Sequence, residues 1–403
     1  MAKNSTRSIS LARVSDMPLL QLAFRPFFLL GAVFSLVAMV IWGAFLQGGI
    51  LLEPYGGLLW WHQHEMLFGF GMAIVIGFLL TAVQTWTGRR GVHGWPLAGL
   101  VALWLAGRLI LAFPPEGAAL IPALVDLALL PAVMLVMARP VLGARQWRNL
   151  IFVPVLGVLF LANVLMHLGM LRGDAPMIRD AAHLTVLLIV LLMVVLGGRV
   201  IPFFTARRLE RTQVARLKWL EASAIGVVVL LVCLQLASFA VALPDRGWAS
   251  VALLAAGLNA LRLTRWDGRR CLHEPLLWGL HLSYALMCVG LAMWGLAALK
   301  LLAPSLALHA ITVGGMGTMM MAMMARVSLG HTGRPIETLP GMDVALEALG
   351  LATMLRTLIP VLWPQVMQWT LSLSALCWVL AFALFVWHYT VLLARPRADG
   401  KPG

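Results

Sequence analysis

Residues 65–86 read EMLFGFGMAIVIGFLLTAVQTW, a run that is long and apolar enough to cross a lipid bilayer as one α-helix. It directly follows WHQH (Trp61–His64), so two histidines and Glu65 lie at the mouth of an otherwise unbroken apolar helix. Ionisable side chains at membrane depth are costly and persist mainly where they bind a ligand or move protons. His62, His64 and Glu65 are therefore the first candidates for function.

The rest of the chain has the same apolar character. Of its 403 residues, 61% are hydrophobic and 11% are charged, and the mean hydropathy is +0.92, which is far above the values of soluble domains. Stretches of roughly 20 apolar residues, the length that crosses the hydrocarbon core, recur about twelve times. We predict an all-α, polytopic integral membrane protein with spans at residues 27–49, 65–86, 96–113, 118–138, 150–171, 181–204, 219–243, 248–264, 275–299, 304–328, 343–363 and 367–394.

The distribution of lysine and arginine predicts the orientation, because positive residues stay with cytoplasmic loops. With both termini inside, most of the 30 lysines and arginines fall on the cytoplasmic side. We therefore expect a cytoplasmic arm at 1–24, a single transmembrane domain at 25–394 and a cytoplasmic tail at 395–403. The residues that this orientation places outside are Arg172, Arg179, Arg246 and Lys300.

The net charge of +14 does not indicate a nucleic-acid partner, because the cations are spread over loops beside helix ends, where they anchor topology against anionic lipid. No signal peptide is predicted, since the first 24 residues lack an apolar core. Two charges inside the spans, Arg108 and Asp126, lie at similar depth on consecutive helices and are expected to form a structural ion pair.

The cysteines predict no covalent cofactor. Cys233, Cys271, Cys288 and Cys377 are scattered singly, with no CxxC pair and no CxxCH haem-attachment motif. Each fits best as a small buried apolar residue. Any haem in this protein is therefore expected to be a b-type haem held by coordination alone.

Eight of the ten histidines fall into two layers when they are sorted by depth, and His93 and His273 lie in predicted cytoplasmic loops. An outer layer and an inner layer are separated by an apolar middle, as expected for metal or haem near the faces, since neutral imidazole is the usual haem and copper ligand. The competing interpretation, a hydrogen-bonding group at a helix end, fits His93, His273 and His388 best. The outer layer holds His62, His64, His167, His183 and His309, and the inner layer holds His281, His331 and His388.

The pair His62 and His64 poses a geometric question. Positions i and i+2 of a helix point about 200° apart, so a fully helical pair cannot bind one metal in one plane. Either the two histidines serve different sites, or the helix begins at His64.

The span at 304–328 carries glycines and methionines that suit a cofactor. Gly314, Gly315 and Gly317 allow close approach of a neighbouring helix or a porphyrin face. A stripe of methionines on one helix face suits Cu(I) or haem, although such a stripe is more often core packing. Arg199 and Arg334 are further cofactor-binding candidates. Arg199 can pair with a haem propionate, or it can act only as a positive-inside anchor. The stripe comprises Met316, Met319, Met320, Met323 and Met324.

Taken together, these motifs resemble the NnrS family of haem- and copper-associated bacterial inner-membrane proteins linked to nitric oxide metabolism. The resemblance covers nearly the whole chain, and the combination of motifs is highly specific. It is carried by FRPFFLLGA (Phe24–Ala32), WHQHEMLFGF (Trp61–Phe70), GFLLTAV with TWTGR (Gly77–Arg89), LWLAGR (Leu103–Arg108), Asn163 with His167, GGRVIPFFT (Gly197–Thr205), His281 with Tyr284, and LHAITVGGMGTM with GHTGRP (Leu308–Pro335).

The resemblance implies haem, copper and NO. The first hypothesis is an oxidoreductase that reduces NO to N2O at one or two b-type haems, with electrons from a quinol or another membrane donor. Glu65 is then the natural proton carrier and Tyr284 a second catalytic candidate. The alternative is a protein that binds NO, haem or copper without turnover and protects or assists other enzymes. A transporter is a weaker alternative, because the two halves share no repeated motif.

The metal-ligand candidates follow from depth and from the resemblance. The expected partners are membrane lipid and NO, and no nucleic acid is expected. The expected location is the bacterial cytoplasmic (inner) membrane. Copper is an open second cofactor. The candidate ligands are His62, His64, His167 and His309 for an outer site, and His281 and His331 for an inner one.

Overall fold

The computed structural model describes residues 17–49 and 52–401, so most of the predicted N-terminal arm lies outside the described residues. The described chain is helical throughout and contains no β-strand. Its helices are η2 (Pro18–Leu20), α1 (Phe24–Leu46), α2 (Gly57–His64), η3 (Glu65–Gly71), α3 (Met72–Thr87), α4 (Gly94–Ala112), α5 (Leu120–Leu127), α6 (Leu129–Gly143), α7 (Trp147–Leu150), α8 (Phe152–Arg172), α9 (Ala175–Leu192), η4 (Met193–Gly197), α10 (Gly198–Arg208), α11 (Lys218–Ala237), α12 (Asp245–Thr264), η5 (Gly268–Cys271), α13 (Pro275–Ala298), α14 (Pro304–His309), η6 (Ala310–Gly317), α15 (Thr318–His331), α16 (Met342–Arg356), α17 (Leu358–Leu362), η7 (Pro364–Val366) and α18 (Met367–Ala394).

These helices make a polytopic membrane protein, as the sequence predicts. Within the described ranges, eleven continuous helical segments are long and apolar enough to cross a bilayer. The predicted span at 248–264 is not among them, although it forms a 20-residue helix, α12, that packs along α11 and α13. Its lower hydrophobicity has a physical reason, because its buried face carries the polar side chains of Asn259 and Arg262.

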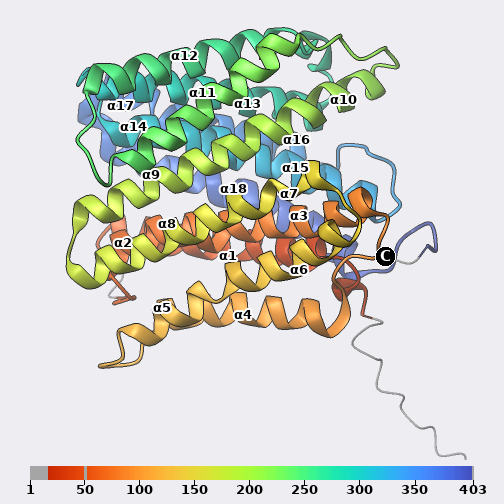
Figure 1. The fold of residues 1–403 in the computed structure, drawn as a ribbon, viewed down its shortest axis with the longest axis horizontal. Coiled ribbons are helices and arrows are strands. Elements are labelled where there is room, and N and C mark those ends of the chain that lie inside the picture. Colours follow the sequence, from red (N-terminus) through yellow and green to blue (C-terminus); the bar gives the residue numbers. More distant parts are fainter. Residues whose placement is uncertain (1–16, 50–51, 402–403) are drawn as a thin grey trace, which may run out of the picture.

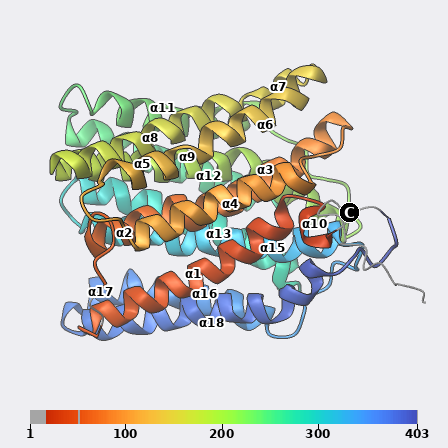
Figure 2. The same cartoon turned by 90° about the horizontal axis from the view of Figure 1, so that it is seen from below.

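The helices run along one common axis and form an elongated bundle. Figure 1 shows α11 and α12 along the upper edge and α4 and α5 along the lower edge. The C-terminus lies at the end of the bundle where α7 and α10 are found, and α2 and α17 lie near the opposite end (Figures 1 and 2). The apolar side chains between the helices form one continuous buried cluster.

Three of the long helices are interrupted by π-helical segments. η3 follows the histidines of α2, η4 continues α9, and η6 follows His309 of α14. A π-helical turn widens the backbone locally and is often found at functional sites. In this protein two of the three segments begin directly after a histidine.

Candidate functional site

A group of six buried polar side chains lies among the helices near α2, and we call it the polar cluster. His64 is the last residue of α2, and Glu65 is the first of η3. The other members come from α4, α5 and α8, so the cluster joins helices that are far apart in sequence. No member is more than 4% exposed to solvent. The polar cluster comprises His64, Glu65, Arg108, Asp126, Asn163 and His167.

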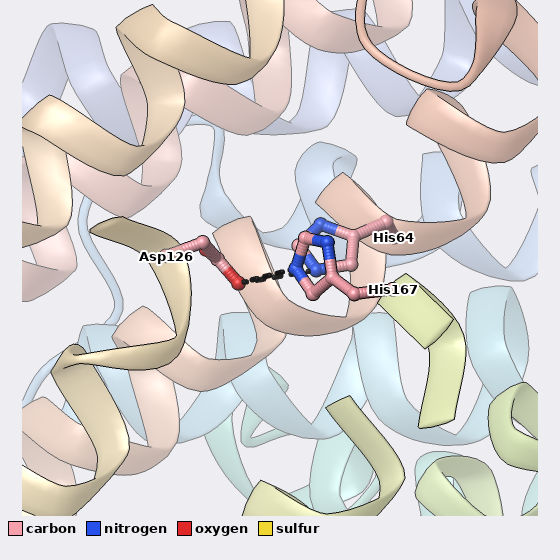
Figure 3. Close-up of side chains that lie close together, drawn as sticks. All are labelled: His64, Asp126 and His167. Atoms are coloured by element: carbon pink, nitrogen blue, oxygen red, sulfur yellow. Dashed lines mark hydrogen bonds and ion pairs between the residues drawn. The ribbon is translucent and has the colours of Figure 1, made fainter. Parts of the chain in front are cut away.

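Asp126 is the centre of the polar cluster. Its Oδ2 accepts a hydrogen bond from Asn163 Nδ2 at 2.7 Å and lies 3.2 Å from His167 Nε2 and 3.3 Å from His64 Nε2. Figure 3 shows the two imidazoles facing this carboxylate. Asn163 and His167 are four residues apart on α8, so both project from the same face of that helix. The guanidinium of Arg108 forms an ion pair with the other oxygen of Asp126, which confirms the predicted pair.

Glu65 extends the cluster on its other side. Its Oε1 lies 2.9 Å from His64 Nδ1 and 3.0 Å from Arg108 Nη1, while its Oε2 is buried without a hydrogen-bond partner. Gly69, one turn later, makes this arrangement possible. A Cβ atom there would lie 2.7 Å from Arg108 Nη1 and 3.0 Å from Glu65 Oε2.

Three members of the polar cluster could hold a metal ion together. One ligand atom from each of His64, Asp126 and His167 lies within 4.8 Å of the others. The two carboxylates and one guanidinium of the cluster leave one negative charge, which must be balanced in a buried site. Either a proton on an imidazole or a bound cation can supply that balance.

Aromatic rings fix the imidazoles of the polar cluster. The ring of Trp60 stacks on His64 at 4.6 Å between centroids, and its Nε1 donates to the backbone carbonyl of Met166. Tyr55 lies in the loop before α2, 5.6 Å from the ring of His167. Burial and the charge of Asp126 raise the pKa of Tyr55 to about 12, so its hydroxyl stays protonated at neutral pH.

A separate cavity of about 350 Å³ lies on the other side of α2, and we call it the histidine cavity. Its walls are mainly apolar, and three histidines line it: His62 from α2, His183 from α9 and His309 from α14. Arg179 and Arg356 also line it, and no aspartate or glutamate does. The volume falls within the range of small-molecule and cofactor sites.

The histidines of this cavity have ring nitrogens available for a ligand. His62 stacks on Trp42 at 4.0 Å, and its Nδ1 is buried without a hydrogen-bond partner. His309 Nδ1 lies 2.6 Å from the backbone carbonyl oxygen of Ser305, a contact that leaves Nε2 for another partner. An unsatisfied buried nitrogen is costly, which favours a ligand in this cavity.

The two histidines of WHQH therefore face different parts of the protein. α2 begins at Gly57, so both His62 and His64 are helical and point to opposite sides. Of the two alternatives, a helix that begins at His64 is wrong. His62 faces the histidine cavity and His64 faces the polar cluster, and binding at two sites stays a prediction.

Comparison with protein families agrees with this architecture. The family model described as NnrS protein matches residues 18–397, nearly the whole chain. The chain belongs to the NnrS family. No curated protein matches it. Membership in the NnrS family supports a membrane protein related to nitric oxide, and the metal-binding geometry of the polar cluster agrees with a metalloprotein.

In this NnrS chain, the three glycines of the span at 304–328 pack against neighbouring helices, and part of the methionine stripe lines a cavity. A Cβ on Gly314 would meet Thr353 and Leu286, one on Gly315 would meet Met287, and one on Gly317 would meet Trp378. These three glycines therefore allow close approach of neighbouring helices, which is one of the two predicted alternatives; the other is the approach of a porphyrin face. Of the methionine stripe, Met316 and Met320 line the histidine cavity, whereas Met319, Met323 and Met324 do not.

His281 and His331, the two predicted ligands of an inner site, have separate surroundings. The ring nitrogens of His281 lie 3.0 Å and 3.2 Å from the carbonyl oxygens of Leu277 and Trp266. The ring of His331 packs against Phe24, 5.6 Å away. The structure shows no cluster that contains both histidines among the described residues.

Three further candidates also lie outside the two sites. Tyr284 donates to Asn259 Oδ1 at 2.6 Å and accepts a hydrogen bond from Arg262, and it does not line the histidine cavity. Arg199 is half-buried on α10, and Arg334 Nη1 donates to the nearby carbonyl of Thr332. The roles of these residues stay predictions.

Sequence reasoning did not assign Asp126 and His183 to the functional sites. Asp126 was expected only to pair with Arg108, although an acidic residue inside an apolar span is itself a signal for a functional site. His183 belongs to the predicted outer histidine layer but is not among the predicted metal ligands. Its place beside His62 and His309 depends on how α2, α9 and α14 pack.

Proposed function

We propose that this protein binds nitric oxide at a b-type haem held in the histidine cavity, in the bacterial cytoplasmic membrane, and reduces it to N2O. The observation that carries the proposal is the convergence of His62, His183 and His309 on one apolar cavity in a chain of the NnrS family. Imidazole is the usual protein ligand of haem iron, and b-type haem needs no cysteine attachment.

The residues of the histidine cavity fit a haem. The imidazoles of His62, His183 and His309 are the side chains that would hold the iron, and His62, whose Nδ1 has no hydrogen-bond partner, is the first choice. Arg356 and Arg179 provide cations for the two propionates in an otherwise apolar wall. The bound haem would supply a redox-active iron that binds NO.

The polar cluster is suited to supply protons. The reaction 2 NO + 2 e⁻ + 2 H⁺ → N2O + H2O takes its electrons from a membrane electron donor such as a quinol and needs two protons. Glu65 and His64 follow His62 within one turn of the same helix, so they lie beside the histidine cavity but face the other way. Glu65 has one unpartnered carboxylate oxygen, which makes it the proposed proton carrier. Because it faces away from the histidine cavity, it would pass its proton on and not donate it directly.

The polar cluster is also the proposed site for copper. Its two imidazoles and one carboxylate are nitrogen and oxygen donors that suit Cu(II). With Cu(II) bound there, the cluster's single negative charge would be offset without a proton, and one positive charge would remain. Metal analysis of purified protein should then find copper in the wild type and in His93→Ala, and lose it in His167→Ala.

Spectroscopy of purified, haem-supplemented protein tests the haem proposal. Reduced-minus-oxidised spectra and haem-to-protein ratios are measured for the alanine variants of His62, His183 and His309, with His93→Ala and His273→Ala as controls. Replacing an axial ligand should remove or convert the haem signal, and acid acetone should extract the haem. Wild-type haem content in all three variants would exclude the histidine cavity as the haem site.

Turnover is tested separately by measuring N2O from NO with an artificial reductant. Wild-type protein that forms a stable NO complex and releases no N2O under any donor would instead support the second candidate, a protein that binds NO for protection. His64 has a partner at both ring nitrogens, which leaves it no free nitrogen for a redox metal, and this is the observation that favours the second candidate.

A further inference from the structure

A second cavity, of about 80 Å³, adjoins the histidine cavity, and we call it the side cavity. Every residue that lines it is apolar or a glycine. Ile189, Met316 and Met320 line both cavities. The two spaces therefore share part of their walls.

The side cavity continues the histidine cavity along the helix axes. On α9 and its continuation, the lining residues pass from His183 through the shared Ile189 to Gly197. At 1.5 Å per residue, the distance from His183 to Gly197 along the helix is roughly 20 Å. The segment from His309 to Met323 shows the same order, with Met316 and Met320 shared between the cavities.

Flexible side chains form the boundary between the cavities. Methionine is unbranched and has three rotatable bonds, so Met316 and Met320 can change conformation without moving the backbone. Gly197, in the π-helical segment η4, lines the side cavity next to Met319, since a Cβ there would lie 3.5 Å from the terminal carbon of Met319. A small molecule in the side cavity therefore needs only side-chain motion to reach the histidines.

The other wall of the side cavity is partly exposed. Val75 and Phe78 of α3, Leu196 of η4 and Val200 of α10 line the side cavity and are only half-buried. Half-buried apolar side chains in a membrane helix face hydrocarbon or a cavity. These apolar side chains make this the side from which a molecule dissolved in the bilayer would approach.

The chemistry of the walls selects the occupant. No side chain in the side cavity offers a water molecule the hydrogen bonds that it needs, and apolar cavities of this kind stay dry and bind species such as xenon. The volume is a few times the roughly 30 Å³ that one water occupies in the liquid, so it suits a diatomic gas. We propose that the side cavity binds small apolar gases and delivers them from the bilayer to the histidine cavity. That the gas is NO rests on the proposed function.

Xenon binding tests the cavity without any haem chemistry. Crystals of the purified protein are pressurised with xenon, and the anomalous signal locates the gas atoms. Xenon is expected beside Gly197 and Met320. Gly197→Ala, which adds one methyl group at ordinary contact distance, should reduce the xenon occupancy. Absence of xenon from the side cavity of the wild type would overturn the proposal.

Delivery is tested by the rate at which NO binds the reduced holoprotein after flash photolysis. Val75→Phe places a large ring in the side cavity and should slow NO association about tenfold, which corresponds to about 1.4 kcal/mol in the barrier. Val289→Phe is the matched control, because Val289 on α13 is 51% exposed and lines neither cavity. Xenon in the cavity with an unchanged NO rate in both Val75→Phe and Gly197→Ala would overturn the delivery role. A wild type that binds no haem or NO would refute only the proposed function, since the xenon result stands apart from it.

Discussion

At the scale of single residues, Glu65 has an unusual position. One carboxylate oxygen contacts His64 and Arg108, while the other is buried without a partner. A carboxylate held in this way keeps its place while a proton is added to or removed from the free oxygen. The geometry therefore supports a proton carrier better than a purely structural anion, which would have both oxygens paired.

Glu65→Gln tests that role. Glutamine keeps the size and hydrogen bonding of glutamate but cannot deliver a proton, so haem content and NO binding should be retained. N2O formation should fall by about 100-fold or more, the usual loss when a general acid is removed. Glu116→Gln, in the exposed loop after α4, serves as the control and should keep the wild-type rate. A wild-type rate in Glu65→Gln would rule out Glu65 as the proton donor.

Asp126 should be the most stability-sensitive acidic residue of the polar cluster. Asp126→Ala removes the carboxylate that pairs with Arg108 and accepts from Asn163, and it leaves a buried guanidinium without its nearest counter-charge. Breaking a buried pair in this way costs about 3–5 kcal/mol. The unfolding midpoint in detergent should fall clearly for Asp126→Ala and less for Asp126→Asn.

Asp245→Ala is the matched control for that prediction. Asp245 and Lys300 form an ion pair whose side chains are 63% and 84% exposed, and exposed pairs contribute little to stability. An equal fall in the midpoint for Asp126→Ala and Asp245→Ala would show that the polar cluster does not stabilise the bundle.

At the scale of elements, the π-helical segment η3 and the helix α4 approach each other at Gly69. Trp104 Nε1 donates to the carbonyl of Gly69, and the guanidinium of Arg108 passes directly over this glycine toward Glu65. A residue with a side chain here would force the two segments apart. Gly69 does not have a positive φ, so its backbone conformation does not require glycine. Glycine is required because a side chain here would collide with Arg108 and Glu65.

Gly69→Ala should therefore weaken the polar cluster. The added methyl group would lie 2.6 Å from a ring carbon of Phe34 and 2.7 Å from Arg108 Nη1, so one of them must move. We expect lower stability and lower N2O formation. Gly99→Ala on α4 has nothing within 4 Å of its new methyl group and should be neutral or stabilising, because alanine favours helix more than glycine. Equal behaviour of the two variants in thermal unfolding and turnover would contradict this account.

Residue patterns predict the elements of this protein better than they predict its sites. Apolar runs predict most of the spans, and opposite charges at equal depth predict the pair of Arg108 and Asp126. The π-helical segments have no comparable signal, because one extra residue per turn leaves the apolar composition unchanged. His183 joins His62 and His309 only through the packing of three helices, which no local pattern contains.

At the scale of the whole molecule, the first and last spans are tied together at one end of the bundle. Arg25 of α1 is fully buried, and its Nη1 donates to the carbonyls of Leu393 and Arg395 at the end of α18. The chain beyond α18 continues along the same end, where Arg397 donates to the carbonyl of His331. The end that holds these contacts is also the end where the C-terminus lies (Figure 2).

Arginine-rich loops gather at this same end, and they predict which face of the membrane it meets. The loops after α3 and α10 and the segment after α12 carry Arg89, Arg211 and Arg269, whereas the loop between α4 and α5 carries only Glu116 as a charged residue. Because positive loops stay in the cytoplasm, the C-terminal end should be cytoplasmic and the end with α2 should face outward. The histidine cavity would then lie nearer the outer face.

Labelling with a membrane-impermeant maleimide tests this orientation. The four native cysteines are replaced by alanine, and Glu116→Cys and Arg211→Cys, both at exposed loop positions, are introduced one at a time. Glu116→Cys should react in intact spheroplasts, and Arg211→Cys should react only after lysis. The reverse pattern would place the polar cluster and the histidine cavity near the cytoplasmic face. Glu65 would then receive its protons from the cytoplasm, and turnover in proteoliposomes of known protein orientation would respond to the pH on the cytoplasmic side.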